Sequence, residues 1–240
     1  MIEKKVLITG ASRGLGLAIA KRLAPHYKLI LHATSESSFK TTIPNSVLLC
    51  ADLSKPEEVS DFCKRLKKEH GDELYAIINN AGIILNSSIL FQPESTIDRV
   101  IQVNLKAPIM ICKAALKIFN LEKRGVIINL SSIVGETGNA FQAVYAATKA
   151  GIVSFSKSLA QEVGVLHEAH NIRVLCVSPG FIETEMTDTI PQAEREKYLS
   201  RIPANKPGKP EDVANLVAFL LSEQASYING TNLHINGGLL

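Results

Sequence analysis

The sequence predicts an α/β protein whose core is a doubly wound parallel sheet of about seven strands, with helices on both faces. Short unbroken runs of aliphatic and β-branched residues recur along the chain, and amphipathic stretches separate them. A strand that is buried on both faces gives such an unbroken run, whereas a half-exposed strand alternates apolar and polar residues. The 240 residues, 46% of them hydrophobic, suit a single domain spanning 1–240.

The order of the expected elements is strand and helix in alternation. The strands are expected at 6–9, 29–33, 47–51, 75–79, 126–131, 172–178 and 232–236. The helices are expected at 14–24, 56–69, 96–119, 145–166 and 210–221, the last opening on a proline that suits a first helical turn. The connection 35–46 is too short for more than a turn or two of helix, so one covering helix is expected to be stunted.

Composition excludes several classes of function. The net charge of +3 is spread without a long basic run, which gives no reason to expect nucleic acid or a membrane as partner. The first apolar run is too short for a secretion signal or a membrane span, so we expect a cytoplasmic protein. The four cysteines form no CxxC pair and are expected to be reduced core residues. The histidines form no HExxH arrangement, and no metal site is expected.

A glycine-rich segment, TGASRGLG at 9–16, lies between the first strand and the first helix. Gly10 permits a tight turn, and Gly14 and Gly16 remove side chains where a pyrophosphate would approach the start of the helix. The free N–H groups and the helix dipole at that point attract phosphate. The segment therefore indicates a dinucleotide site in a Rossmann-like fold, although the spacing differs from GxGxxG and a purely structural turn is the alternative.

Residues after the second strand bear on the choice of cofactor. An acid at this point would bind a ribose 2′-hydroxyl and favour NADH, whereas basic and hydroxyl groups suit a 2′-phosphate. Thr34 and Ser35, together with Arg13 of the glycine turn, favour NADPH, and Glu36 argues against it.

After the third strand stands Asp52, followed by Leu53. The carboxylate of Asp52 could accept a hydrogen bond from an adenine amino group. It could equally cap the helix expected to open at Pro56.

The strongest indication of chemistry is a serine followed by a tyrosine and a lysine. Ser132 ends the fifth strand, and Tyr145 and Lys149 are four residues apart, on one face of a helix. Hydride transfer to a carbonyl leaves negative charge on oxygen, which Ser132 could stabilise and the Tyr145 phenol could protonate. A neighbouring ammonium would lower the phenol pKa from about 10. Ser131 is expected to point away from the site, and a simple surface contact between Tyr145 and Lys149 is the alternative.

These motifs, with NNAG at 79–82 and SPGFIET at 178–184, resemble the short-chain dehydrogenase/reductase family over nearly the whole chain. The stretches ATSES, SIVGETGNAFQAVYAATKAGIVSFSKSLAQEV, SPGFIETEMT and LHINGG are similar to those of the family's 3-oxoacyl-[acyl-carrier-protein] reductases. The resemblance implies NADPH-dependent reduction of a 3-oxoacyl thioester to the 3-hydroxyacyl product in fatty acid synthesis. It also implies Asn104 as a fourth catalytic residue. The cofactor contacts that it adds are Ser12, Leu15, Asn80, Ala81, Gly82, Pro179, Gly180, Ile182 and Thr184, with Tyr145 and Lys149 at the nicotinamide end.

The chain departs from the resembled reductases after NNAG, where IILNSSILFQP lacks their usual Arg-Asp pair. Lys113, Lys123 and Arg124 are candidates for contacts with an acidic carrier protein. The two longest helices carry more apolar surface than one sheet face needs, so by analogy we expect a homotetramer. The proline-rich segment 183–210 could form a flexible lid over the substrate, or could be an ordinary surface connection.

Two other functions remain possible at this stage. One keeps the chemistry but changes the substrate to a free alcohol, sugar, steroid or quinone. The other is a non-catalytic protein that senses NADP(H), which would normally have lost Tyr145 or Lys149.

Overall fold

One sheet of seven parallel strands forms the centre of the computed structural model, which describes residues 4–166, 171–185, 187 and 192–240. The strand order is β3-β2-β1-β4-β5-β6-β7. Every pairing is parallel, so the carboxyl ends of all strands lie along one edge. The strands are β1 (Lys5–Ile8), β2 (Lys28–Leu31), β3 (Ser46–Leu48), β4 (Leu74–Asn79), β5 (Arg124–Leu130), β6 (Asn171–Pro179) and β7 (Asn232–Ile235).

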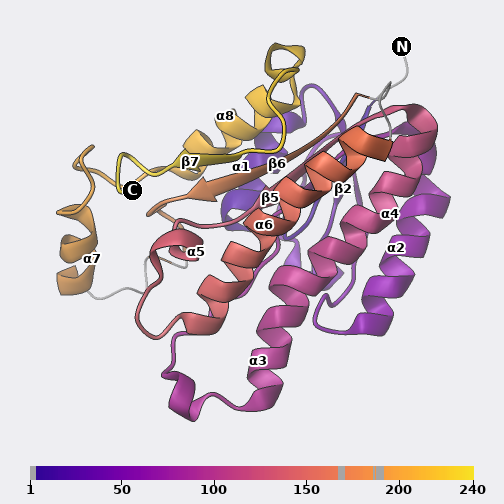
Figure 1. The fold of residues 1–240 in the computed structure, drawn as a ribbon. Coiled ribbons are helices and arrows are strands. Elements are labelled where there is room, and N and C mark those ends of the chain that lie inside the picture. The colour runs from indigo at the N-terminus through magenta and orange to yellow at the C-terminus, as the bar shows by residue number, and fades with distance from the viewer. Residues whose placement is uncertain (1–3, 167–170, 186, 188–191) are drawn as a thin grey trace.

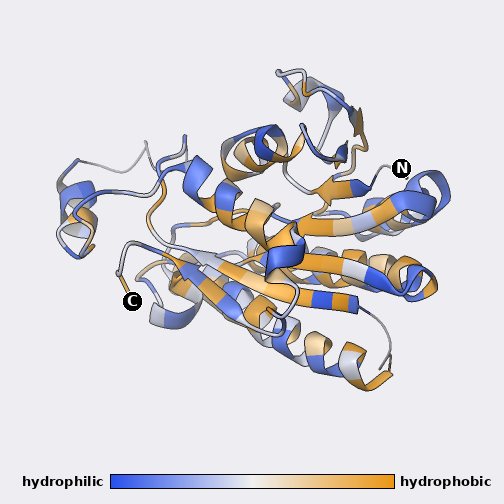
Figure 2. Ribbon diagram, turned by 90° about the horizontal axis from the view of Figure 1, so that it is seen from above, coloured by the Kyte–Doolittle hydropathy of each residue, from blue (hydrophilic) through white to orange (hydrophobic). Residues whose placement is uncertain are grey.

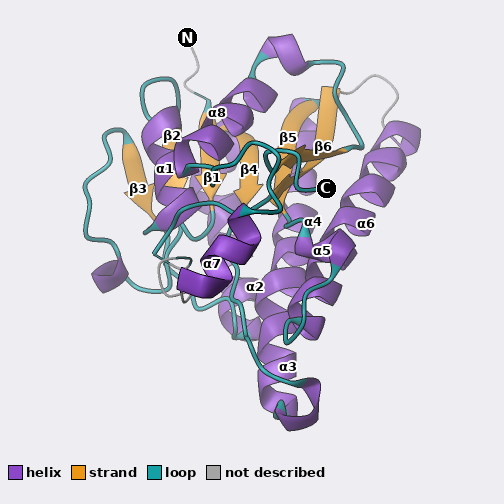
Figure 3. Cartoon of the chain, turned by 90° about the vertical axis from the view of Figure 1, so that its left-hand side faces the viewer, coloured by secondary structure: helices purple, strands orange, loops and turns teal. Residues whose placement is uncertain are grey.

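Helices cover both faces of this sheet (Figures 1 and 3). Helices α1 (Gly14–Leu23) and α8 (Pro210–Leu221) pack together on one face. Helices α2 (Pro56–His70), α4 (Ala107–Glu122) and α6 (Ala143–Leu166) cover the other. The prediction of an α/β doubly wound sheet of about seven strands is confirmed. No helix in the described part of the chain is both long and apolar enough to cross a membrane.

The alternation of side chains along each strand divides the core in two. Val6 and Ile8 of β1 pack into the cluster under α1 and α8, while Leu7 packs with Phe62 and Ile111 on the opposite face. Apolar residues therefore dominate the central strands throughout, as their hydropathy colouring shows (Figure 2). Burial on both faces explains why these strands appear in the sequence as unbroken apolar runs.

The connection between β2 and β3 holds only the 3₁₀ turn η1 (Glu36–Ser38), so the expected stunted helix is confirmed. Strand β3 at the sheet edge has three residues, and Val47 and Leu48 are exposed. All four cysteines are free thiols; Cys112 and Cys176 are buried and the other two are partly buried. Burial raises the pKa of Cys112 and that of Cys176 to about 12, which keeps both thiols protonated.

The prediction of one continuous α-helix over 96–119 is wrong in the middle of that range. The chain forms α3 (Glu94–Ile101), a π-helical turn η4 (Gln102–Lys106) and then α4, with the Ala107 N–H bonded to the Gln102 carbonyl. Pro108 explains the change, because a proline has no N–H to donate and its ring would clash with the carbonyl four residues earlier. That carbonyl belongs to Asn104, which lies in the π turn.

The strand order reverses direction at β1 and β4, whose connections leave toward opposite sides. Open α/β sheets bind ligands in the crevice beyond the carboxyl ends of the strands at such a point. The glycine turn follows β1 there, and NNAG follows β4.

Candidate active site

The glycine turn has the backbone that the sequence predicts for a phosphate site. Gly10 and Gly14 have φ values of +64° and +53°, in the left-handed region that favours glycine. A Cβ on Gly16 would come within 2.2 Å of the Gly10 carbonyl oxygen. Helix α1 starts at Gly14 with no acidic residue in its first turn, and the side chain of the N-cap residue Arg13 makes no capping hydrogen bond. The first N–H groups of α1 are therefore not capped by Arg13 and remain suited to an anion.

Asn80 fastens this turn to the end of β4. Its Nδ2 donates to the carbonyls of Thr9 and Gly10 at 2.9 and 3.1 Å. The Thr9 hydroxyl in turn accepts from the N–H groups of Asn80 and Ala81, both at 3.0 Å. Asn80, which we predict to contact the cofactor, therefore also has a structural role, because the same side-chain amide holds the turn in its conformation. Ser12 and Leu15 lie partly buried within the turn and the start of α1.

The residues predicted to hold the ribose phosphate lie where β1 and β2 end side by side. Arg13, Thr34 and Ser35 are all exposed. The Ser35 hydroxyl hydrogen bonds with those of Ser37 and Ser38, at 2.9 and 2.8 Å. The structure therefore adds the hydroxyls of Ser37 and Ser38 to the predicted set, because the turn η1 brings them back to Ser35.

Asp52 does not cap α2. Its Oδ1 accepts from the N–H and the hydroxyl of Ser54 at 3.0 and 2.7 Å, while the N-cap position is Lys55. Burial alone would raise the pKa of Asp52, but the hydrogen bonds from Ser54, together with the nearby charges of Lys55 and Arg99, hold the pKa below its usual value. The Leu53 side chain is buried in the core, so the predicted cofactor contact of Leu53 would have to use its backbone.

Ser132, Tyr145 and Lys149 come together at the carboxyl edge of the sheet. The Ser132 hydroxyl lies beside the Tyr145 phenol, near enough to act on the pKa of the phenol. The Lys149 Nζ lies 5.7 Å from the centre of the Tyr145 ring and donates to the Leu130 carbonyl at 2.8 Å. Ser131 points away, as predicted, and its hydroxyl donates to the Lys149 carbonyl at 2.8 Å.

The predicted lowering of the tyrosine pKa is not what the structure gives. Burial raises the pKa of Tyr145 to about 12, and the neighbouring Ser132 hydroxyl offsets only part of this. Burial also lowers the pKa of Lys149 to about 8. The physical reason is that both groups are almost fully buried, which disfavours the charged form of each. The phenol therefore keeps its proton at neutral pH.

Asn104 is buried in the π turn and faces the same region. Its Oδ1 accepts from the Ile83 N–H and its Nδ2 donates to the Ile83 carbonyl, both at 2.8 Å. A Cβ on Gly82 would lie 3.4 Å from Asn104 Oδ1 and 3.6 Å from Lys149 Nζ, so these groups surround one point. The side chain thus has a clear structural task in holding the NNAG exit, besides the relay role that the resemblance implies.

The segment after β6 links the two halves of the site. The Pro179 carbonyl accepts from the Ile133 N–H at 3.1 Å, which holds the Ser132 loop in place. Thr184 lies across from the glycine turn, because a Cβ on Gly14 would come 3.9 Å from its Cγ2. Gly180 is pressed against Asn236, and the Ile182 side chain is buried.

Gly135 is a site residue that pattern reasoning did not single out. A Cβ there would lie 2.8 Å from the Lys149 carbonyl carbon and from the Ala150 nitrogen. Only glycine therefore allows the short helix α5 (Val134–Thr137), directly after Ser132, to pack this closely on α6. No periodic signal marks such a position, because the close approach is between segments distant in the sequence.

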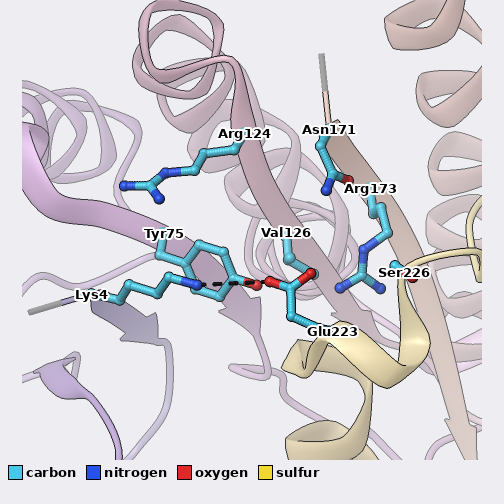
Figure 4. A pocket seen from close by; sticks show the side chains of 8 residues that line it. All are labelled: Lys4, Tyr75, Arg124, Val126, Asn171, Arg173, Glu223 and Ser226. Carbon is cyan, nitrogen blue, oxygen red and sulfur yellow. Dashed lines mark ion pairs between the residues drawn. The ribbon is translucent and has the colours of Figure 1, made fainter. Parts of the chain in front are cut away.

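A separate cavity of about 70 Å³ lies at the amino edge of the sheet (Figure 4). Its charged lining includes Lys4, Arg124, Arg173 and Glu223. Arg173 donates to the carbonyls of Ala225 and Leu220 at 2.9 and 2.8 Å, so it ties the end of α8 to β6. The cavity is thus structural and lies across the sheet from Ser132. Lys123 caps the end of α4 and Arg124 begins β5 at this edge, and Lys113 is exposed on α4.

Comparison with known proteins identifies the family. A family model described as enoyl-(acyl carrier protein) reductase matches residues 10–240. The chain belongs to the short-chain dehydrogenase/reductase family.

Among its relatives in this family are 3-oxoacyl-[acyl-carrier-protein] reductases from three bacteria. The protein of Escherichia coli K12 is 38% identical over 241 residues, 98% of this chain and 97% of the relative. That of Vibrio cholerae is 39% identical over 244 residues, covering 99% and 98%. That of Rickettsia felis is 40% identical over 244 residues, covering 99% and 97%.

The residues on the carboxyl edge fit the dinucleotide that a short-chain dehydrogenase/reductase fold implies. Gly10 and Gly16 allow the turn to close tightly on itself and against Asn80 and Ala81, beside the first N–H groups of α1, where a pyrophosphate would lie. A Cβ on Gly82 would be in contact with both Asn104 and Lys149, so glycine keeps the gap between these two side chains clear. Hydroxyl groups after the end of β2 and the Arg13 side chain before α1 lie where they would bind a ribose phosphate.

Proposed function

We propose that this protein reduces a 3-oxoacyl thioester, carried on acyl carrier protein, to the 3-hydroxyacyl product in fatty acid synthesis, with NADPH as the reductant. The observation that carries this proposal is that the Ser132 and Tyr145 hydroxyls come together at the carboxyl edge of the sheet, with the Lys149 Nζ 5.7 Å from the centre of the tyrosine ring. The names of the bacterial relatives support the substrate.

The two hydroxyls define where a substrate carbonyl oxygen would bind. Ser132 donates a hydrogen bond to the oxygen as it becomes negative, and Tyr145 transfers its proton to it. NADPH, when bound, supplies the hydride that reaches the carbonyl carbon. A pKa of about 12 suits Tyr145 to this direction, because a proton donor must be protonated at working pH. Lys149 stabilises the phenolate that remains and binds the ribose hydroxyls of the cofactor. Asn104 holds a water that returns the proton to this chain of groups.

For the cofactor, Arg13, Thr34 and Ser35 hold the 2′-phosphate and the start of α1 holds the pyrophosphate. Asp52 and Leu53 bind the adenine, and Asn80, Ala81 and Gly82 line its ribose. Pro179, Gly180, Ile182 and Thr184 contact the nicotinamide end. The position of Thr184 beside Gly14 supports this, because one segment then reaches both ends of the crevice.

Steady-state kinetics with a panel of substrates and both cofactors test the proposal. We expect acetoacetyl-carrier thioester to be reduced, with kcat/KM about tenfold or more higher for NADPH than for NADH, since a 2′-phosphate gains charge-assisted hydrogen bonds. Small free ketones serve as the control and should react poorly. Reduction of a crotonyl thioester alone would instead make the protein an enoyl reductase, as the description of the family model has it. Activity on free alcohols or sugars without thioester activity would also contradict the proposal.

We further propose a cytoplasmic homotetramer. The two longest helices, α4 and α6, carry exposed large apolar side chains. These are Met110 and Leu121 on α4, and Val165 and Leu166 on α6. Burial of such surface between subunits would stabilise an assembly. Sedimentation equilibrium should give four times the 26.0 kDa chain mass. A monomer at micromolar concentration would contradict it.

The segment 183–210 is proposed to act as a substrate lid, and part of it lies outside the described residues. Its base is held by hydrogen bonds of Gly208 with Phe181 and Glu183, both at 2.9 Å. It includes a helix that the sequence did not predict, α7 (Gln192–Leu199), from which Tyr198 stacks on Phe181. Carrier contacts at Lys113, Lys123 and Arg124 stay a prediction.

A further inference from the structure

His32 is a buried polar side chain beside the glycine turn that the reaction chemistry does not use. It follows β2 directly, and its side chain is almost fully enclosed. The ring Nδ1 accepts from the Gly10 N–H at 3.1 Å, and Nε2 donates to the Ala51 carbonyl at 2.9 Å. Phe62 of α2 packs edge-on against the ring at 5.3 Å. One imidazole thus joins the glycine turn, the end of β2 and the exit from β3.

These contacts satisfy backbone groups that the turn cannot satisfy itself. The Gly10 carbonyl accepts from Asn80, while its N–H has the His32 ring as partner. The next N–H along the chain, that of Ala11, donates to the His32 carbonyl at 2.9 Å. His32 therefore binds two successive N–H groups and fixes the left-handed conformation of Gly10 from which α1 begins.

We propose that His32 is a positioning residue for the dinucleotide: through its unprotonated Nδ1 it holds Gly10 so that the first N–H groups of α1 face the pyrophosphate. The inference rests on the proposed cofactor binding. A turn that lost this bond would populate other conformations, and binding would have to select the competent one, which lowers the apparent affinity.

The electrostatic surroundings favour the neutral ring that this role needs. Burial lowers the pKa of His32 from 6.5, and this outweighs the hydrogen bond to Ala51 and the nearby Asp52 carboxylate, which act in the opposite direction. Asp52 is the charged group that bears on it from the β3 side, while Phe62 and Gly10 contribute none. Protonation would turn a second N–H toward that of Gly10 and break the bond.

Three substitutions of His32 separate the effect of the hydrogen bond at Nδ1 from that of the hydrogen bond at Nε2. His32→Asn keeps an acceptor at the level of Nδ1 and loses the donor to Ala51. His32→Gln keeps a donor at the level of Nε2 and loses the acceptor for Gly10, and His32→Leu loses both. We expect Gln and Leu to weaken NADPH binding about tenfold, since the partly buried Gly10 N–H loses its partner, with KM for NADPH raised and kcat nearly unchanged. Asn should stay close to wild type.

NADPH binding is measured by fluorescence titration, and thermal unfolding is followed for every variant. Below pH 6.5 the affinity of the wild type should fall more steeply than that of His32→Asn, a comparison that removes the titration of the cofactor's own phosphate. If the Gln and Leu variants had lower melting temperatures but unchanged affinity for NADPH, the positioning role of His32 would be overturned, while the proposed function would stand. A wild type that binds neither NADPH nor NADH would overturn the proposed function and this inference with it.

Discussion

Replacing Tyr145 with phenylalanine is expected to lower kcat for carbonyl reduction by about a hundredfold or more, the usual contribution of a positioned proton donor. The change removes one oxygen atom from a buried ring whose hydroxyl lies beside that of Ser132. Affinity for NADPH should stay within about twofold, because the pyrophosphate site lies at the other end of the crevice. Single-turnover kinetics and direct cofactor titration measure the two quantities separately.

Tyr75→Phe is a matched control for that experiment. Its hydroxyl donates to the Leu221 carbonyl at 2.9 Å, at the amino edge of the sheet and away from Ser132. This variant should lose about 1 kcal/mol of folding stability but retain its turnover. Equal activity of Tyr145→Phe and wild type would refute Tyr145 as the proton donor.

Gly16→Ala is expected to produce the second-largest effect, a loss of cofactor affinity of more than about tenfold. The added methyl would lie 2.2 Å from the Gly10 oxygen and 2.6 Å from Asn80 Nδ2. The turn and the Asn80 amide would therefore have to move apart. Overpacking of this kind costs about 1–3 kcal/mol. For a chain of this size each kcal/mol lowers the melting temperature by about 2–4 °C. Cofactor titration and thermal unfolding check both effects.

Gly164→Ala provides the comparison, because it makes the same change within α6, where a Cβ would meet no atom of the described residues within 4 Å. Alanine in a helix interior is favoured over glycine by about 0.5–1 kcal/mol, so this variant should bind cofactor normally and be slightly more stable. If Gly16→Ala behaved in the same way, the close packing of α1 on the turn would not matter for binding.

Much of the fold, and part of the site, could be predicted from local patterns in the sequence. The unbroken apolar runs at Val6 and Val126 are imposed by burial on both faces, so the layered fold was predictable. The helical spacing of Tyr145 and Lys149 was equally predictable, because residues four apart share a helix face. The break at η4 had a signal in Pro108 that the long apolar pattern obscured. The helix α7 had none, since its residues show little apolar periodicity.

The layered sheet and the residue types at the end of each strand follow from local patterns along the chain. The folded structure fixes how those ends are held together: the His32 ring on Gly10, the Asn80 amide on Thr9, and the close packing of Gly135 on α6. It also set the pKa of Tyr145 at about 12, opposite in direction to what its neighbour Lys149 suggested. The reason is the same in each case, since burial and long-range hydrogen bonds depend on residues far apart in the chain, and no local spacing encodes them.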